Sequence, residues 1–219
     1  MNPLFLSTLL AFLLLPLSVF ASKAPDGWET LDNCRLSKSS YADGDSFHVS
    51  HQGKDQIFRL YFVDCAETDI RIPSRIKDQQ EAFGLSAQGV IAAGHQAAAF
   101  TSKLLARPFT VLTKWEDARG ASRQQRFYAI VLVNGKNLAT ELVRNGLARA
   151  YGMPTDFPDK TRSKSFASEL RLLQARATRD KIGAFAGSSK VLAAEVPKAT
   201  PSDPDTILDT VLDAPIEQN

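Results

Sequence analysis

The chain has 219 residues, which favours one principal domain with terminal extensions over several large domains. Hydrophobic residues make up 44% of it and charged residues 23%, values that are ordinary for a globular protein and indicate no particular function class. The formal net charge of +2 hides an asymmetry, because residues 191–219 carry six acids against one lysine. The rest of the chain is therefore positive and is the part that would meet a polyanion.

The N-terminal segment is typical of an export signal. Residues 4–21 are almost wholly apolar, and Val19-Phe20-Ala21 resembles a small-x-small cleavage site before Ser22. An uncleaved membrane anchor is the alternative, because about 18 apolar residues are near the lower limit for a membrane span. Pro16 and the small residue at the end favour cleavage. We therefore expect an exported protein, periplasmic or secreted, that is cleaved near Ala21 and has no membrane contact in its mature form.

Residues 22–33 form a polar lead-in, and the next part of the chain has the pattern of β-strands. Residues 46–49 and 57–63 are rich in aromatic and β-branched residues and lie on either side of a turn at 51–55, which predicts a hairpin. The strand-like pattern begins at Cys34, and an earlier strand is expected before Tyr41. The segment 69–82 is charged, and Pro73 within it is expected to act as a breaker, so the sequence predicts irregular structure there.

The second half mixes helices and strands. Apolar spacing and turn residues predict three helices, at 86–105, 138–145 and 166–179. Two further strands are expected at 109–115 and 126–133, the second followed by a tight Asn134-Gly135 turn. Five strands with about three covering helices fit a mainly β, α+β fold built on a five-stranded barrel, which leaves a face for oligonucleotides. The Pro-, Asp- and Ala-rich segment 188–219 has little to bury and is predicted to be a disordered tail.

Two cysteines, Cys34 and Cys65, would form one disulfide in an exported chain. Two free or separately buried thiols are the alternative, and the sequence leaves it open. The three histidines are scattered and supply no spacing of a zinc site.

Charged residues that could take part in catalysis or metal binding are concentrated in two segments. These are 41–49 (Tyr-Ala-Asp-Gly-Asp-Ser-Phe-His-Val) and 58–68 (Phe-Arg-Leu-Tyr-Phe-Val-Asp-Cys-Ala-Glu-Thr). Carboxylates near a strand end with an arginine among them suggest a hard cation and a bound phosphate. Arg59 and Asp64 are five residues apart and would face opposite sides of a regular strand, so we expect a twist, bulge or strand end before Asp64. Arg126 lies at the start of another predicted strand. Together, these carboxylates and two arginines predict a metal-dependent phosphodiesterase.

These motifs resemble the thermonuclease family typified by staphylococcal nuclease. The resemblance is carried by Asp-Gly-Asp-Ser-Phe from position 43, by Phe-Arg-Leu-x-x-Val-Asp-x-x-Glu-Thr from position 58, and by Arg-x-x-Ala-x-Val from position 126. It runs from about Asn33 to Phe185. It implies an OB-fold, a Greek-key barrel, in a nuclease domain at 34–187 followed by the acidic tail.

The resemblance also implies roles for single residues. Asp45 and Asp64, with the backbone carbonyl of Cys65, would bind a calcium ion, since calcium takes oxygen ligands. Glu67 matches the acid that positions or deprotonates the attacking water. In place of the Thr-Pro pair that the family usually has before this acid, the chain has Cys65-Ala66, which leaves the turn less constrained.

The two matching arginines, Arg59 and Arg126, would grip the scissile phosphate and stabilise the charge that develops on it. Arg123 and Tyr151 are weaker candidates for substrate contact, the first with a phosphate and the second in a nucleotide pocket.

The resemblance implies a calcium-dependent endonuclease that cuts DNA and RNA and leaves 3′-phosphates, and with the N-terminal signal it gives an exported enzyme. We expect little sequence specificity, because recognition is aimed mainly at phosphate. We expect single strands to be preferred, and we expect a monomer without a protein partner. A catalytically inactive nucleic-acid-binding OB-fold module and a surface module with structural calcium are the alternatives. Because the two arginines and the three acidic positions are all filled, the nuclease is the favoured interpretation.

Overall fold

The structure is a computed structural model that describes residues 27–37, 43–120 and 124–187. The predicted export signal, Arg123 and the acidic tail lie outside these residues. Within the described part of the chain, no helix combines the length and the apolar character needed to cross a membrane.

Five strands close into a barrel in the order β3-β2-β1-β5-β6, and β6 pairs back with β3. The β3–β6 pairing is parallel and the others are antiparallel. This confirms the predicted five-stranded α+β barrel. The strands of the barrel are β1 (Glu29–Leu36), β2 (Ser46–His51), β3 (Lys54–Leu60), β5 (Phe109–Asp117) and β6 (Phe127–Val133). Two-residue β7 (Lys136–Asn137) extends the sheet beside β6, and β4 (Asp64–Cys65) pairs with β8 (Ala148–Arg149) outside the barrel.

The barrel forms because its strands alternate between a buried and a more exposed face, as a period of two requires. In β5, for example, Phe109, Val111 and Thr113 are buried while their neighbours are partly exposed. Asn134 and Gly135 both have positive φ, 49° and 76°, as the predicted tight turn between β6 and β7 requires.

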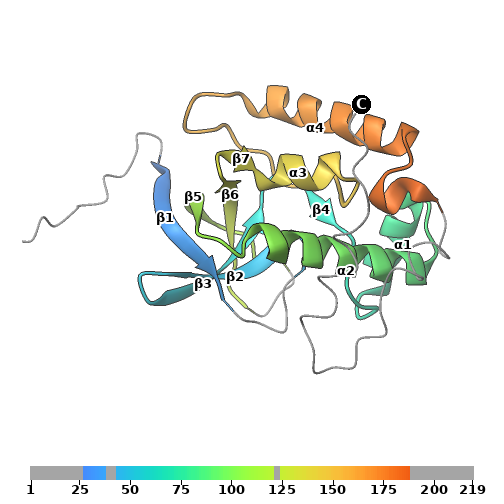
Figure 1. Cartoon of the computed structure of the whole chain (residues 1–219), viewed down its shortest axis with the longest axis horizontal. Helices are drawn as coiled ribbons and strands as arrows, with labels where there is room; N and C mark the ends of the chain where they lie inside the picture. Colours follow the sequence, from blue (N-terminus) through green and yellow to red (C-terminus); the bar gives the residue numbers. More distant parts are fainter. Residues whose placement is uncertain (1–26, 38–42, 121–123, 188–219) are drawn as a thin grey trace, which may run out of the picture.

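Helices cover one side of the barrel and extend beyond its end (Figure 1). Helix α3 lies between α2 and α4, and the 3₁₀ turn η2 lies against α2 and α4. The three predicted helices are confirmed. The elements are α1 (Pro73–Phe83), α2 (Ala87–Leu104), α3 (Leu138–Arg144), α4 (Ser163–Arg179) and η2 (Gly183–Ala186).

Side-chain caps fix where two of these helices begin. The Ser86 side chain accepts a hydrogen bond from Gly89 N at the start of α2, and Asn137 does the same for Ala139 N at the start of α3. Gly146, with φ of 64°, follows α3 as predicted.

Helix α1 corrects the prediction of irregular structure over 69–82. Pro73 does not break a helix here; it is the first residue of one, a position where the missing N–H costs nothing. Gly84 ends the helix with φ of 69°. Ile76 and Phe83 are buried in a second, smaller core, where the Phe83 ring lies 5.3 Å from that of Phe185.

The expected irregularity before Asp64 is present. Strand β3 ends at Leu60, and Phe62 has a positive φ of 70°, so the chain turns before β4 begins at Asp64. Because of this turn, Asp64 lies on the same side as Arg59 despite the odd spacing, with 3.2 Å between their nearest charged atoms.

The structure does not contain the disulfide considered from sequence, because Cys34 and Cys65 are both free and buried. Cys34 lies in β1 and donates a hydrogen bond to Leu31 O, whereas Cys65 lies in β4 with its Sγ packed over Gly44. Burial raises the pKa of the Cys34 thiol to about 11, so it stays protonated at neutral pH.

Candidate active site

Two buried carboxylates meet where β2 begins and β4 runs past it. Asp45 is 3% exposed and Asp64 is 1% exposed. The Asp45 Oδ2 atom accepts a hydrogen bond from Cys65 N at 3.1 Å, which ties the two segments together. Asp43 lies beside them, and its Oδ1 accepts from Asp45 N at 3.2 Å. Burial, followed by the charge of Asp45, raises the pKa of Asp43 well above its usual range.

Arg59 lies at the end of β3, opposite Ser46 of β2 and Tyr128 of β6. Its Nη2 is 3.2 Å from Asp64 Oδ1 and 3.5 Å from Asp45 Oδ2. The charge of Asp45 is the main cause of a raised pKa at Arg59, so the guanidinium remains charged.

The closing β3–β6 pairing brings Arg126, the residue before β6, to the same end of the barrel. Its Nη1 is 3.4 Å from Ser46 Oγ, and its Nη2 donates to Arg119 O at 3.0 Å. The Nε of Arg126 is buried and has no hydrogen-bond partner within the described residues. Burial, helped by the charge of Arg59, lowers the pKa of Arg126. An incoming anion would satisfy the unpaired N–H and offset the repulsion between the two guanidinium groups.

Glu67 follows β4 on a turn that helix α2 holds closely. A Cβ placed on Gly94 of α2 would lie 2.3 Å from Glu67 O and 2.7 Å from Ala66 O, so only glycine fits this approach. The Glu67 side chain is 24% exposed, and its Oε1 accepts from Arg75 Nε at 2.5 Å.

Three residues that contact Asp64 were not assigned to the carboxylate site from sequence: Arg75, Gln79 and Arg149. The Asp64 carboxylate accepts from Arg75 Nη2 at 2.7 Å, from Arg149 Nε at 2.9 Å and from Gln79 Nε2 at 3.2 Å. Burial opposes the ionisation of Asp64, but the neighbouring arginines outweigh it, and the pKa of Asp64 is lowered. A helix assigned to 73–83 would have placed Arg75 and Gln79 on one face, four residues apart.

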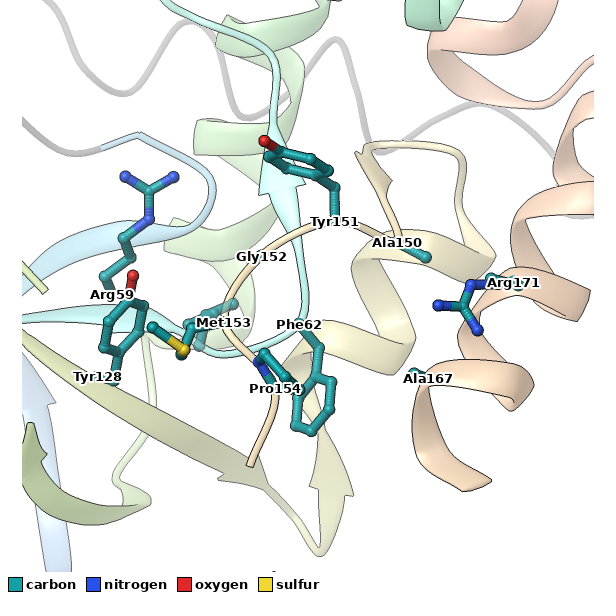
Figure 2. Close-up of a pocket in the computed structure, with 11 residues that line it drawn as sticks. Arg59, Phe62, Tyr128, Ala150, Tyr151, Gly152, Met153, Pro154, Ala167 and Arg171 are labelled. Atoms are coloured by element: carbon teal, nitrogen blue, oxygen red, sulfur yellow. The ribbon is translucent and has the colours of Figure 1, made fainter. Parts of the chain in front are cut away.

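A pocket of about 620 Å³ opens beside Arg59 (Figure 2). Arg59, Tyr128 and Met153 lie close together in this view, and Arg171 of α4 lies on the opposite side. Tyr151, one of the two predicted substrate contacts, lines the pocket and is 59% exposed. The Arg149 guanidinium lies over the Tyr151 ring, 4.4 Å from its centre. The pocket thus combines cationic and aromatic groups next to the carboxylates.

The predicted calcium ligands come together, and they are oxygen donors of the kind that calcium takes. The described residues contain no group of three or more His, Cys, Asp or Glu side chains that would hold a metal. The predicted set needs only two carboxylates, with the Cys65 carbonyl as the third ligand, and so fits calcium by donor chemistry. Gln79 Nε2 already donates to two of these oxygens, Cys65 O at 2.9 Å and Asp64 Oδ2 at 3.2 Å.

A comparison with protein families agrees with this geometry. The family model described as staphylococcal nuclease homologue matches residues 57–185, more than half of the 219-residue chain. The matched range includes Arg59, Asp64, Glu67 and Arg126, whereas Asp45 precedes it. Together with the closed barrel, the match shows that the chain belongs to the family of staphylococcal nuclease homologues.

Proposed function

We propose that the protein is an exported, calcium-dependent endonuclease that hydrolyses phosphodiester bonds in DNA and RNA. Membership of the nuclease family supports a nucleic-acid hydrolase in general. The single observation that carries the proposal is the convergence of Arg59 and Arg126 from paired strands, next to Asp45 and Asp64. Export rests on the apolar segment 4–21 of the sequence.

In the proposed reaction the two arginines bind the scissile phosphate. The buried Nε of Arg126 and the charge of Arg59 would hold its oxygens and stabilise the negative charge that grows as water attacks phosphorus. Glu67 would take the proton of that water, because its side chain is 24% exposed and so can reach water, against 4% for Asp45 and 1% for Asp64. The bond from phosphorus to the 5′ oxygen breaks, the leaving oxygen gains a proton, and a 3′-phosphate remains.

Asp45, Asp64 and the Cys65 carbonyl would hold the calcium ion, which would supply further positive charge beside the phosphate. The hydrogen bond from Cys65 N to Asp45 and the Arg59 guanidinium, which contacts both carboxylates, support this pairing of ligands.

The pocket beside Arg59 supports a preference for single strands. Tyr151 and Tyr128 offer aromatic faces to a base or sugar, and stacking accepts every base. Recognition directed at phosphate carries no sequence information, so we propose little sequence specificity. A base must leave a duplex to reach the pocket, which favours single-stranded DNA and RNA.

A second candidate is a nucleic-acid-binding barrel that does not cut. It is favoured by the ion pair between Arg75 and Glu67, because the carboxylate of the proposed general base is already paired with a guanidinium. The two candidates are separated by incubating the purified protein with single-stranded DNA, duplex DNA and RNA, in calcium, in magnesium and in chelator. Calcium-dependent cleavage with 3′-phosphate ends supports the endonuclease. Binding without cleavage in every metal supports the inactive barrel.

A further inference from the structure

Helix α1 directs two side chains at the turn that carries the proposed ligands and base. Gln79 is fully buried, with an exposed fraction of 0%. Its Oε1 accepts a hydrogen bond from Glu67 N at 2.8 Å, and its Nε2 donates to Cys65 O and to Asp64 Oδ2. Both ends of this amide are therefore used to hold residues 64–67.

Arg75 lies one turn earlier on the same face of α1. Its Nη2 is 2.7 Å from Asp64 Oδ1, and its Nε is 2.5 Å from Glu67 Oε1. One guanidinium therefore bridges a proposed metal ligand and the proposed general base.

Four hydrogen-bond donors already surround the Asp64 carboxylate. Its Oδ1 accepts from Arg59 and Arg75, and its Oδ2 accepts from Arg149 and Gln79. A carboxylate offers about four lone-pair positions, so a cation that binds Asp64 must displace one of the four donors.

The charges of the cluster lead to the same conclusion. Three carboxylates form ion pairs with three guanidinium groups, so the cluster has no negative excess to attract a divalent cation. Its members are Asp45, Asp64, Glu67, Arg59, Arg75 and Arg149.

Among the arginines that contact Asp64, Arg75 is the one placed to withdraw. Its side chain is 31% exposed, against 21% for Arg59 and 14% for Arg149. It also lies in the first turn of α1, directly after a surface segment in which Ile70 and Ile72 are exposed.

We propose that helix α1 competes with calcium for the carboxylate site, with the Arg75 guanidinium holding Asp64 and Glu67 until the ion displaces it. This inference rests on the proposed function. It makes Arg75 a determinant of calcium affinity, and it couples calcium binding to the release of Glu67, because the same guanidinium holds both acids.

Calcium titration of the purified full chain by isothermal calorimetry tests the competition. Arg75→Met removes the charge and keeps the aliphatic stem, and Lys77→Met makes the same change two residues away at an exposed position of α1. Removing a positive charge a few ångströms from the ion should tighten calcium binding by at least about tenfold in Arg75→Met. Lys77→Met should change it by less than about twofold. Arg75→Gln, a polar variant, should show the same direction as Arg75→Met.

The competition is overturned if both Arg75 variants bind calcium no more tightly than the wild type. Cleavage of single-stranded DNA by the same proteins separates this failure from failure of the proposed function. Calcium-dependent cleavage by all of them, with unchanged affinity in the Arg75 variants, would reject the competition and keep the endonuclease. Tighter calcium binding in the Arg75 variants, with no cleavage by any protein, would support the competition and reject the endonuclease.

Discussion

The side-chain carbonyl of Gln79 accepts a 2.8 Å hydrogen bond from the backbone N–H of Glu67, linking helix α1 to the turn after β4. The same amide donates to Cys65 O at 2.9 Å. This turn carries Cys65-Ala66 and lacks a proline, so Gln79 supplies the constraint that fixes the position of Glu67. Helix α1 is therefore part of the site's support as well as of the second core.

Replacing Gln79 with leucine should lower both stability and activity. The substitution leaves Glu67 N and Cys65 O without their side-chain partner, at a cost of about 1–3 kcal/mol in the free energy of unfolding for an unsatisfied buried group. Urea unfolding and cleavage kinetics measure the two effects. Gln80→Leu, at the half-buried neighbouring position, is the control and should stay within about 0.5 kcal/mol. Equal effects of the two substitutions would show that Gln79 does not constrain the turn.

Gly94→Ala should destabilise the protein although alanine favours helices. The new Cβ would lie 2.3 Å from Glu67 O, a backbone atom that cannot move without shifting the turn. Overpacking of this kind costs about 1–3 kcal/mol, which exceeds the gain of up to about 1 kcal/mol from helix propensity. Thermal unfolding and the cleavage rate should both decrease. A variant as stable and as active as the wild type would contradict the close approach of α2 to Glu67.

The ion pairs of Asp64 predict a loss of stability in acid. Because its arginine partners lower the pKa of Asp64 in the folded protein, the carboxylate stabilises the fold above its unfolded pKa of about 3.9. That contribution is lost as the pH falls through the lower folded value. Urea unfolding between pH 2 and pH 6 should therefore show a decline that is smaller in Asp64→Asn, which has no carboxylate to protonate there. Parallel pH profiles of the two proteins would contradict this assignment.

The sequence predicted the barrel because its strands have strong signals. Aromatic and β-branched residues are concentrated in β2 and at the end of β3, and the Asn134-Gly135 turn marks the end of β6. The proximity of Arg59 to Asp64 also followed, once an irregularity between them was expected, and the positive φ of Phe62 provides it.

The missed part of the site depends on contacts that leave little trace in sequence. Helix α1 is short and charged, and Pro73 has opposite meanings at the start and in the middle of a helix. Arg149 reaches Asp64 through the pairing of β4 with β8, strands of two residues each that are too short to show a period. The sequence left open whether Cys34 and Cys65 are bridged, because a disulfide depends on the distance between the two residues, which sequence spacing does not reveal; the structure has both thiols free.

Cleavage of end-labelled single-stranded DNA in calcium by the wild type, Arg59→Ala and Arg126→Ala tests the central claim most directly. Each substitution removes a group proposed to stabilise charge on the phosphate, so the cleavage rate constant should fall by about 100-fold or more. Arg162→Ala, which removes a guanidinium whose side chain is 80% exposed, should leave the rate nearly unchanged. Near-normal cleavage by both Arg59→Ala and Arg126→Ala would contradict the account, because the two arginines would then have no part in the reaction.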